Sequence, residues 1–199
     1  MKLEGKIALV TGAAQGMGRA IVRHFAEQGA TVYAADINVQ ALEETVAGLA
    51  ERGRVQHCNV ADEQSVLDAF ARIAAESGRL DILVNKAGIG SHDSFLDTPL
   101  DHWNRVIGVN LTGAFLCSRE AARLMSQAGS GAIVNLASTA AMTGEGPSHY
   151  CASKAAIMGL TRSTARELAA SGIRVNTLVP GPTDTPMMAG IPSEWMDAM

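Results

Sequence analysis

Thr11-Gly-Ala-Ala-Gln-Gly16-Met-Gly18 is the stretch of sequence that decides the fold. It lies between an apolar run at residues 7–10 and a segment in which Met17, Ile21 and Phe25 recur at helical spacing. Glycines at such a junction let the backbone turn sharply and approach a phosphate closely, and the start of a helix offers free amide donors. The stretch therefore predicts a strand, a glycine-rich turn and a helix that together bind a dinucleotide.

The same alternation of short apolar runs and helical segments continues along the chain. The runs are almost entirely apolar, which is typical of parallel strands covered by helices on both faces. Glycines stand where helices are expected to end, at Gly29, Gly53, Gly78 and Gly172. We therefore predict one α/β domain over residues 1–199, a Rossmann-type doubly wound parallel sheet. The expected strands are residues 7–10, 31–35, 55–58, 82–84, 132–136 and 173–179.

Composition excludes several other classes of protein. Of the 199 residues, 47% are hydrophobic and 18% charged, as in an ordinary globular domain. The net charge of -4 predicts neither a nucleic-acid partner nor attraction to an anionic membrane. The amino terminus resembles no signal or transit peptide, no apolar run is long enough for a membrane span, and we expect a cytoplasmic protein. The histidines and the three cysteines lack metal-site spacing, so no metal is expected.

Asp36 predicts which dinucleotide the turn binds. It follows the second apolar run, eighteen residues after Gly18. A carboxylate at that place accepts the ribose hydroxyls of adenosine and repels a 2'-phosphate. No arginine occupies this position or the next one, Ile37, so NAD is favoured over NADP. The alternative interpretation is that Asp36 caps the amino terminus of the following helix.

The spacing Thr-Gly-x3-Gly-x-Gly resembles that of the short-chain dehydrogenases/reductases, and the resemblance continues in order along essentially the whole chain. Asn59-Val60-Ala61-Asp62 resembles the family segment that contacts adenine, and residues 180–185, Pro-Gly-Pro-Thr-Asp-Thr, resemble a cofactor-contacting segment after the sixth strand. Asn85-Lys86-Ala87-Gly88 resembles the family's Asn-Asn-Ala-Gly, with Lys86 as a departure that either disturbs packing and cofactor seating or extends into solvent. The resemblance implies an NAD site made of Gly12, Gln15, Gly16, Met17, Gly18, Asp36, Ile37, Asn59, Val60, Asn85, Ala87, Gly88, Tyr150, Lys154, Pro180, Gly181, Thr183 and Thr185.

Tyr150-Cys-Ala-Ser-Lys154 carries the expected chemistry. A separation of four residues places the phenol and the ammonium one helical turn apart on the same face. A free phenol has a pKa of about 10. A nearby ammonium group and the nicotinamide charge are both expected to lower that pKa, so that the phenol can act as a base. The resemblance implies the catalytic set Asn110, Ser138, Tyr150 and Lys154, with Ser138 holding the substrate oxygen and Asn110 anchoring a proton-relay water through its backbone carbonyl.

The implied activity is hydride transfer between NAD and a secondary alcohol or ketone, with Tyr150 as acid and base. Two alternatives stay open: an NAD-binding scaffold or sensor without turnover, and a 3-ketoacyl thioester reductase, which usually uses NADPH. The sequence does not identify the alcohol or ketone.

The resemblance also predicts the substrate side and the assembly. Family members usually continue past residue 199 with a helix and a seventh strand, so the last strand is expected to be missing and a substrate lid at residues 183–199 to be truncated. Helices near residues 104–127 and 153–170 are expected to form a homodimer or homotetramer. The residues expected to line the substrate pocket are Gly90, Thr139, Ala140, Glu145, His149, Pro182, Met187 and Met188.

Overall fold

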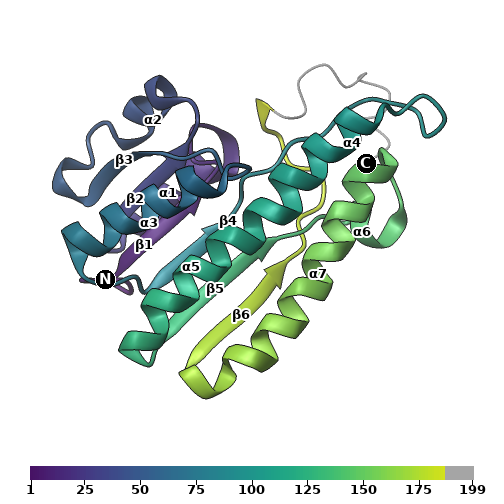
Figure 1. Cartoon of the computed structure of the whole chain (residues 1–199). Helices are drawn as coiled ribbons and strands as arrows, with labels where there is room; N and C mark the ends of the chain where they lie inside the picture. Colours follow the sequence, from purple (N-terminus) through teal and green to yellow (C-terminus); the bar gives the residue numbers. More distant parts are fainter. Residues whose placement is uncertain (187–199) are drawn as a thin grey trace.

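The computed structural model describes residues 1–186, which form one parallel six-stranded sheet in the order β3-β2-β1-β4-β5-β6 (Figure 1). The chain moves outward from β1 to β3, returns to place β4 beside β1, and then moves outward again to β6. This reversal confirms the doubly wound sheet and creates a switch point between β1 and β4. The strands are β1 (Ile7–Thr11), β2 (Thr31–Asp36), β3 (Gly53–His57), β4 (Ile82–Asn85), β5 (Gly131–Leu136) and β6 (Ile173–Leu178).

Helices cover the sheet because neighbouring residues of each inner strand point to opposite faces. Leu9 packs in a cluster with residues of α3, α5 and α7, whereas its neighbours Ala8 and Val10 pack in a second cluster with residues of α1 and α2. Both clusters are apolar, which explains why the strands read as continuous apolar runs. The main helices are α1 (Gly16–Glu27), α2 (Val39–Val46), α3 (Glu63–Ser77), α4 (Leu100–Ile107), α5 (Gly113–Ala128), α6 (Ala140–Thr143) and α7 (Ser148–Leu168).

Most of the predicted boundaries lie within one or two residues of those observed, but Gly53 ends the short helix η1 and not α2. Helix α2 ends at Val46, and the glycine with positive φ beyond it is Gly48, at +81°. Gly53 instead follows the short helix η1 (Ala50–Arg52) and begins β3 with a φ of -107°. A side chain there would meet the Val46 side chain at 2.8 Å, so this glycine serves close packing between α2 and β3.

The helix predicted near residues 104–127 extends from Leu100 to Ala128 and contains one π-helical turn. Helix α4, the π-helical turn η2 (Gly108–Thr112) and α5 follow one another without a break. A π turn inside an α-helix commonly marks a functional position, and Asn110 lies within this one. The remaining short helix is η3 (Ala169–Ser171).

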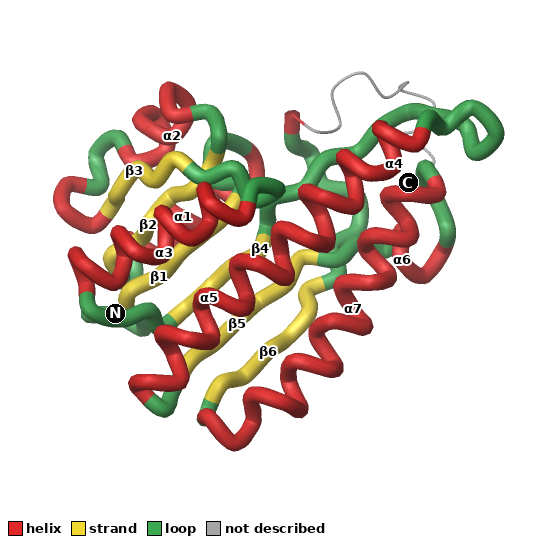
Figure 2. Tube along the Cα trace, viewed as in Figure 1, coloured by secondary structure: helices red, strands yellow, loops and turns green. Residues whose placement is uncertain are grey.

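The loops that follow the strands meet at the carboxyl end of the sheet, where α4 and α6 also lie (Figure 2). Ligands of doubly wound proteins bind at that end, beside the switch point. Among residues 1–186, no helix is long and apolar enough to cross a membrane. The predicted lid at residues 183–199 lies mostly outside the described residues.

Candidate active site

The glycine-rich turn after β1 packs closely against the neighbouring backbone. Gly12 and Gly16 have φ values of +67° and +53°, which side-chain-bearing residues rarely adopt. A side chain at Gly12 would come within 2.8 Å of the Ala87 Cα, so the turn rests directly on the chain after β4. No side chain caps the first turn of α1, which also carries no acidic residue. Its amides are therefore available to an anion.

Gly18 is the glycine whose substitution is expected to do the most damage. A Cβ atom there would lie 2.1 Å from the Gly12 carbonyl oxygen. We expect Gly18→Ala to destabilise the protein by about 2–3 kcal/mol, although alanine ordinarily favours helices. We also expect it to weaken dinucleotide binding by at least about tenfold, because α1 must move away from the turn. Thermal unfolding and calorimetric titration would measure both effects.

Gly159 supplies the matched control for that substitution. It lies in the middle of α7, and a Cβ atom there would have nothing within 4 Å. Gly159→Ala is therefore expected to stabilise the protein by about 0.5–1 kcal/mol. If both alanine variants were equally stable, the tight approach of α1 to the turn would be contradicted.

Asp36 ends β2 beside the glycine-rich turn. Its carboxylate accepts hydrogen bonds from the backbone amides of Ala14, at 3.2 Å, and Asn38, at 3.1 Å. The N-cap of α2 is Asn38, whose side chain accepts from the Ala41 amide, so the alternative in which Asp36 caps this helix is wrong. The carboxylate is thus fixed next to the turn by two amides.

Other predicted cofactor residues lie in three segments, at Thr185 near the end of the described chain, at Ile37 after β2, and at Asn59 and Val60 after β3. Thr185 lies against Gly16, where a Cβ atom would meet its side chain at 3.2 Å, and Ile37 is 66% exposed after β2. Val60 is buried against Gly113, and the Asn59 side chain accepts a hydrogen bond from the Ala61 amide. The segment after β3 is therefore held by a local hydrogen bond and by packing against the start of α5.

Asn85, the last residue of β4, is buried and hydrogen-bonded to the neighbouring strand and helix. Its side-chain amide donates to the Asn135 side chain at 2.8 Å, to the Ser118 hydroxyl at 2.9 Å and to the Ala114 carbonyl at 3.3 Å. These contacts join β4 to β5 and α5. The amide nitrogen of Asn85 is therefore engaged within the fold, whereas its Oδ1 makes no hydrogen bond with the described residues.

Three of the four predicted catalytic residues meet beside Gly88. A Cβ atom at Gly88 would lie 3.4 Å from both the Lys154 Nζ and the Asn110 Oδ1. Lys154 donates to the Leu136 carbonyl at 2.8 Å, and its Nζ lies 5.7 Å from the centre of the Tyr150 ring. Helix α7 thus presents Tyr150 and Lys154 one turn apart at the ends of β4 and β5, as the spacing predicts.

Asn110 organises this group through its side chain. The amide accepts from the Ile89 backbone N–H at 2.8 Å and donates to the Ile89 carbonyl and to the Ser153 hydroxyl, each at 3.0 Å. Ser153 in turn donates to the Tyr150 carbonyl at 2.7 Å. Asn110 therefore ties the loop after β4 to the first turns of α7.

The protonation of the pair differs from the prediction. Burial raises the pKa of Tyr150 above its ordinary value, an effect that the nearby Ser138 hydroxyl partly offsets. Burial, together with the smaller effect of the Lys86 charge, lowers the pKa of Lys154 to about 8. Lys154 is thus largely neutral at the pH where a phenol titrates. The expectation that its ammonium lowers the Tyr150 pKa is therefore wrong for the protein alone.

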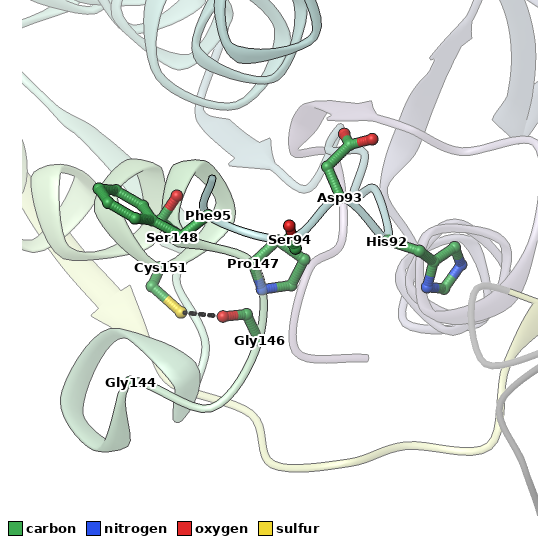
Figure 3. A pocket seen from close by; sticks show the side chains of 9 residues that line it. All are labelled: His92, Asp93, Ser94, Phe95, Gly144, Gly146, Pro147, Ser148 and Cys151. Atoms are coloured by element: carbon green, nitrogen blue, oxygen red, sulfur yellow. Dashed lines mark hydrogen bonds between the residues drawn. The ribbon is translucent and has the colours of Figure 1, made fainter. Parts of the chain in front are cut away.

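A cavity of about 610 Å³ lies between residues 92–95 and the start of α7 (Figure 3). We call it the recess. A Cβ atom at Gly146, in its wall, would lie 3.9 Å from the Tyr150 ring. The residues that line the recess are His92, Asp93, Ser94, Phe95, Gly144, Gly146, Pro147, Ser148 and Cys151.

Within residues 1–186, none of the predicted pocket residues lines the recess. Glu145 is exposed, and His149 is completely buried, with its Nε2 bonded to the Ser91 hydroxyl. Met187 and Met188 lie outside the described residues. Residues 92–95, which the prediction missed, follow the carboxyl end of β4, and that position is the signal that would have found them.

Two acidic or nucleophilic groups line the recess. Hydrogen bonds from Ser91 and His102 lower the pKa of Asp93, so it is a carboxylate at neutral pH. Burial raises the pKa of the Cys151 thiol, which contacts the Gly146 carbonyl (Figure 3). A thiol of this kind is a weak nucleophile. Among the described residues, no three His, Cys, Asp or Glu side chains gather as a metal site.

Comparison with known proteins gives a consistent result. A family model described as short chain dehydrogenase matches residues 6–195. Over 194 residues the chain is 44% identical to the cis-4-hydroxycyclohexanecarboxylate dehydrogenase of Sinomonas cyclohexanicum, covering 95% of this chain and 78% of that protein. It is 38% identical over 198 residues to a 3-oxoacyl-[acyl-carrier-protein] reductase of Thermotoga maritima, covering 98% and 80%.

A solved structure shows the same arrangement of elements. The crystal structure of a short-chain type dehydrogenase/reductase from Mycobacterium marinum superposes with a TM-score of 0.93 at 35% identity, covering 99% of this chain and 80% of that one.

Proposed function

The chain belongs to the family of short-chain dehydrogenases, and we propose that it transfers a hydride between NAD and a secondary alcohol or the matching ketone. The observation that carries this proposal is the meeting of Tyr150, Lys154 and Asn110 beside Gly88, next to the recess. Such a group holds and moves a proton at a substrate oxygen.

The residues present fit a dinucleotide. The close contacts at Gly12 and Gly18 exclude any side chain at these two positions, so the backbone of the glycine-rich turn stays accessible. The first turn of α1 has no side-chain cap, and its free amides suit a pyrophosphate. Asp36, held beside the glycine-rich turn by the Ala14 amide, would accept the hydroxyls of the adenosine ribose and thereby favour NAD. The guanidinium of Arg19, next to the same turn, is held by the Ala14 carbonyl and by Glu44, so it is already engaged. When bound, NAD supplies the hydride acceptor and a positive charge.

The mechanism assigns one task to each side chain. Ser138 holds the substrate oxygen, and Tyr150 takes the hydroxyl proton during oxidation or returns it during reduction. Lys154, fixed by the Leu136 carbonyl, orients the nicotinamide ribose. Asn110 keeps the loop after β4 in place against α7. The raised pKa of Tyr150 makes it an acid in the protein alone, and it needs the positive charge of the bound cofactor to act as a base.

The proposal also covers the cell context and the assembly. We propose a cytoplasmic enzyme that acts on a small molecule as a homodimer or homotetramer. The exposed Phe115 on α5 is consistent with a subunit contact on that helix. Sedimentation velocity would test the assembly.

The decisive experiment measures absorbance of reduced nicotinamide with NAD or NADP, against secondary alcohols, polyols and hydroxysteroids. Turnover with NAD supports the proposal. Silence with every substrate despite measurable NAD binding would favour a scaffold or sensor. Reduction of 3-ketoacyl thioesters with NADPH alone would favour the thioester reductase, the activity named for the Thermotoga maritima relative.

Asp36 provides a quantitative prediction within that experiment. We expect Asp36→Ala to lower kcat/KM with NAD by about tenfold and to raise the NADP-to-NAD ratio of kcat/KM, because the ribose loses its acceptor and a 2'-phosphate loses its repulsion. The ratio is its own control, since a general loss of the loop structure lowers both values. An unchanged ratio would contradict the role of Asp36.

A further inference from the structure

Lys86 is a cation at the switch point whose place the structure defines. Its backbone N–H and that of Ala87 both donate to the Thr11 hydroxyl at 3.1 Å. The Lys86 carbonyl carbon would lie 3.2 Å from a Cβ atom on Gly12. The backbone after β4 thus packs directly against the glycine-rich turn. These contacts involve only backbone atoms of Lys86, so its side chain does not disturb them.

The backbone at Lys86 lies between the two ends of the predicted cofactor site, because the next residue, Ala87, rests on Gly12 and the one after it, Gly88, adjoins the Lys154 Nζ. The Asp36 carboxylate raises the pKa of the Lys86 side chain, while burial has the larger and opposite effect. Its charge also lowers the pKa of Lys154. Lys86 is therefore near both the carboxylate expected to hold the adenosine ribose and the lysine expected to hold the nicotinamide ribose. In a dinucleotide, the group between the two riboses is the pyrophosphate.

The electrostatics of this place favour an anion. Lys86 is only partly exposed, and within residues 1–186 its ammonium makes no hydrogen bond or ion pair. Lys86 and Lys154 repel each other, and the Asp36 carboxylate near Lys86 is already held by two backbone amides. A group with two negative charges would relieve the repulsion between the lysines, and charge-assisted hydrogen bonds to phosphate are strong.

We propose that Lys86 binds a phosphate of the nucleotide cofactor, a contact that the asparagine usual at this position in the family would not make by charge. The inference rests on the proposed function. The phosphate chemistry has two sources, the pyrophosphate and the 2'-phosphate of NADP. The position of Lys86, directly beside the glycine-rich turn and near Lys154, favours the pyrophosphate.

The test is calorimetric titration of the full chain with NAD, NADP and ADP. Lys86→Met keeps the length of the side chain and removes its charge, whereas Lys86→Arg keeps the charge. Lys2→Met is the matched control, because it removes one charge from an exposed residue at the amino terminus. Thermal unfolding without nucleotide confirms that each variant is folded.

We expect Lys86→Met to weaken NAD and ADP binding by about tenfold, and the loss to shrink at high salt. Lys86→Arg and Lys2→Met are expected to stay within about threefold of the unmodified chain. Weakening of NADP alone would assign the contact to the 2'-phosphate. Unchanged binding of all three nucleotides to Lys86→Met would overturn the inference but leave the proposed function intact. If the unmodified chain bound no nucleotide, the proposed function would fail with it.

Discussion

Tyr150→Phe is expected to lower kcat by about 10³-fold and to leave the dissociation constant of NAD within about twofold. The substitution removes only the oxygen that exchanges a proton with the substrate. The ring stays beside Lys154 and Gly146, so the recess keeps its shape. Steady-state rates and calorimetric titration would separate the two effects.

The second tyrosine of the chain is the matched control. Tyr33 is completely buried, and its hydroxyl contacts Glu76 at 3.0 Å and Ser77 at 2.8 Å, far along the chain from the recess. Tyr33→Phe is expected to cost about 1–2 kcal/mol of stability and to leave kcat unchanged. Full activity of Tyr150→Phe, or equal losses in both variants, would refute the assignment of the proton to Tyr150.

Lys154→Met is expected to lower activity by at least about 10²-fold while making the cofactor-free protein more stable at pH 7. Burial lowers the pKa of Lys154 to about 8, so the charged form costs about 3 kcal/mol in the folded state. Methionine removes that cost but leaves the Leu136 carbonyl without its donor, a loss of about 1 kcal/mol. The net gain of about 2 kcal/mol corresponds to a Tm higher by about 4–8 °C.

The pH dependence of that gain follows from the lowered pKa. Between pH 8 and the ordinary value of 10.5, the unfolded chain binds the Lys154 proton while the folded chain has released it. The free energy of unfolding of the unmodified protein therefore increases as pH rises from about 8 to 10.5, because the penalty for the buried charge disappears. The Tm difference between Lys154→Met and the unmodified protein should shrink from pH 7 to pH 10. A difference that stayed constant, or a variant less stable at pH 7, would refute the buried charge.

These two predictions depend on different kinds of information. The pairing of Tyr150 with Lys154 follows from a separation of four residues on a helix, which the sequence displays directly. The direction of both pKa shifts does not, because it depends on how much protein surrounds each group. The sequence suggested that the ammonium would assist the phenol. In the fold, burial raises the pKa of Tyr150 and lowers that of Lys154. As pH rises, Lys154 therefore loses its proton before Tyr150 does.

The sequence by itself determined the order of strands and helices along the chain and the glycine-rich turn, because these depend on local periodicity and spacing. The set of catalytic residues came from the resemblance to a known family. Only the tertiary structure decided which way the side chains point. Asn85 turns to β5 and α5, His149 is buried under the loop after β4, and residues 92–95 supply a wall of the recess. The physical reason is that each of these contacts joins segments far apart in the chain, so that packing and burial, which no local pattern encodes, select them.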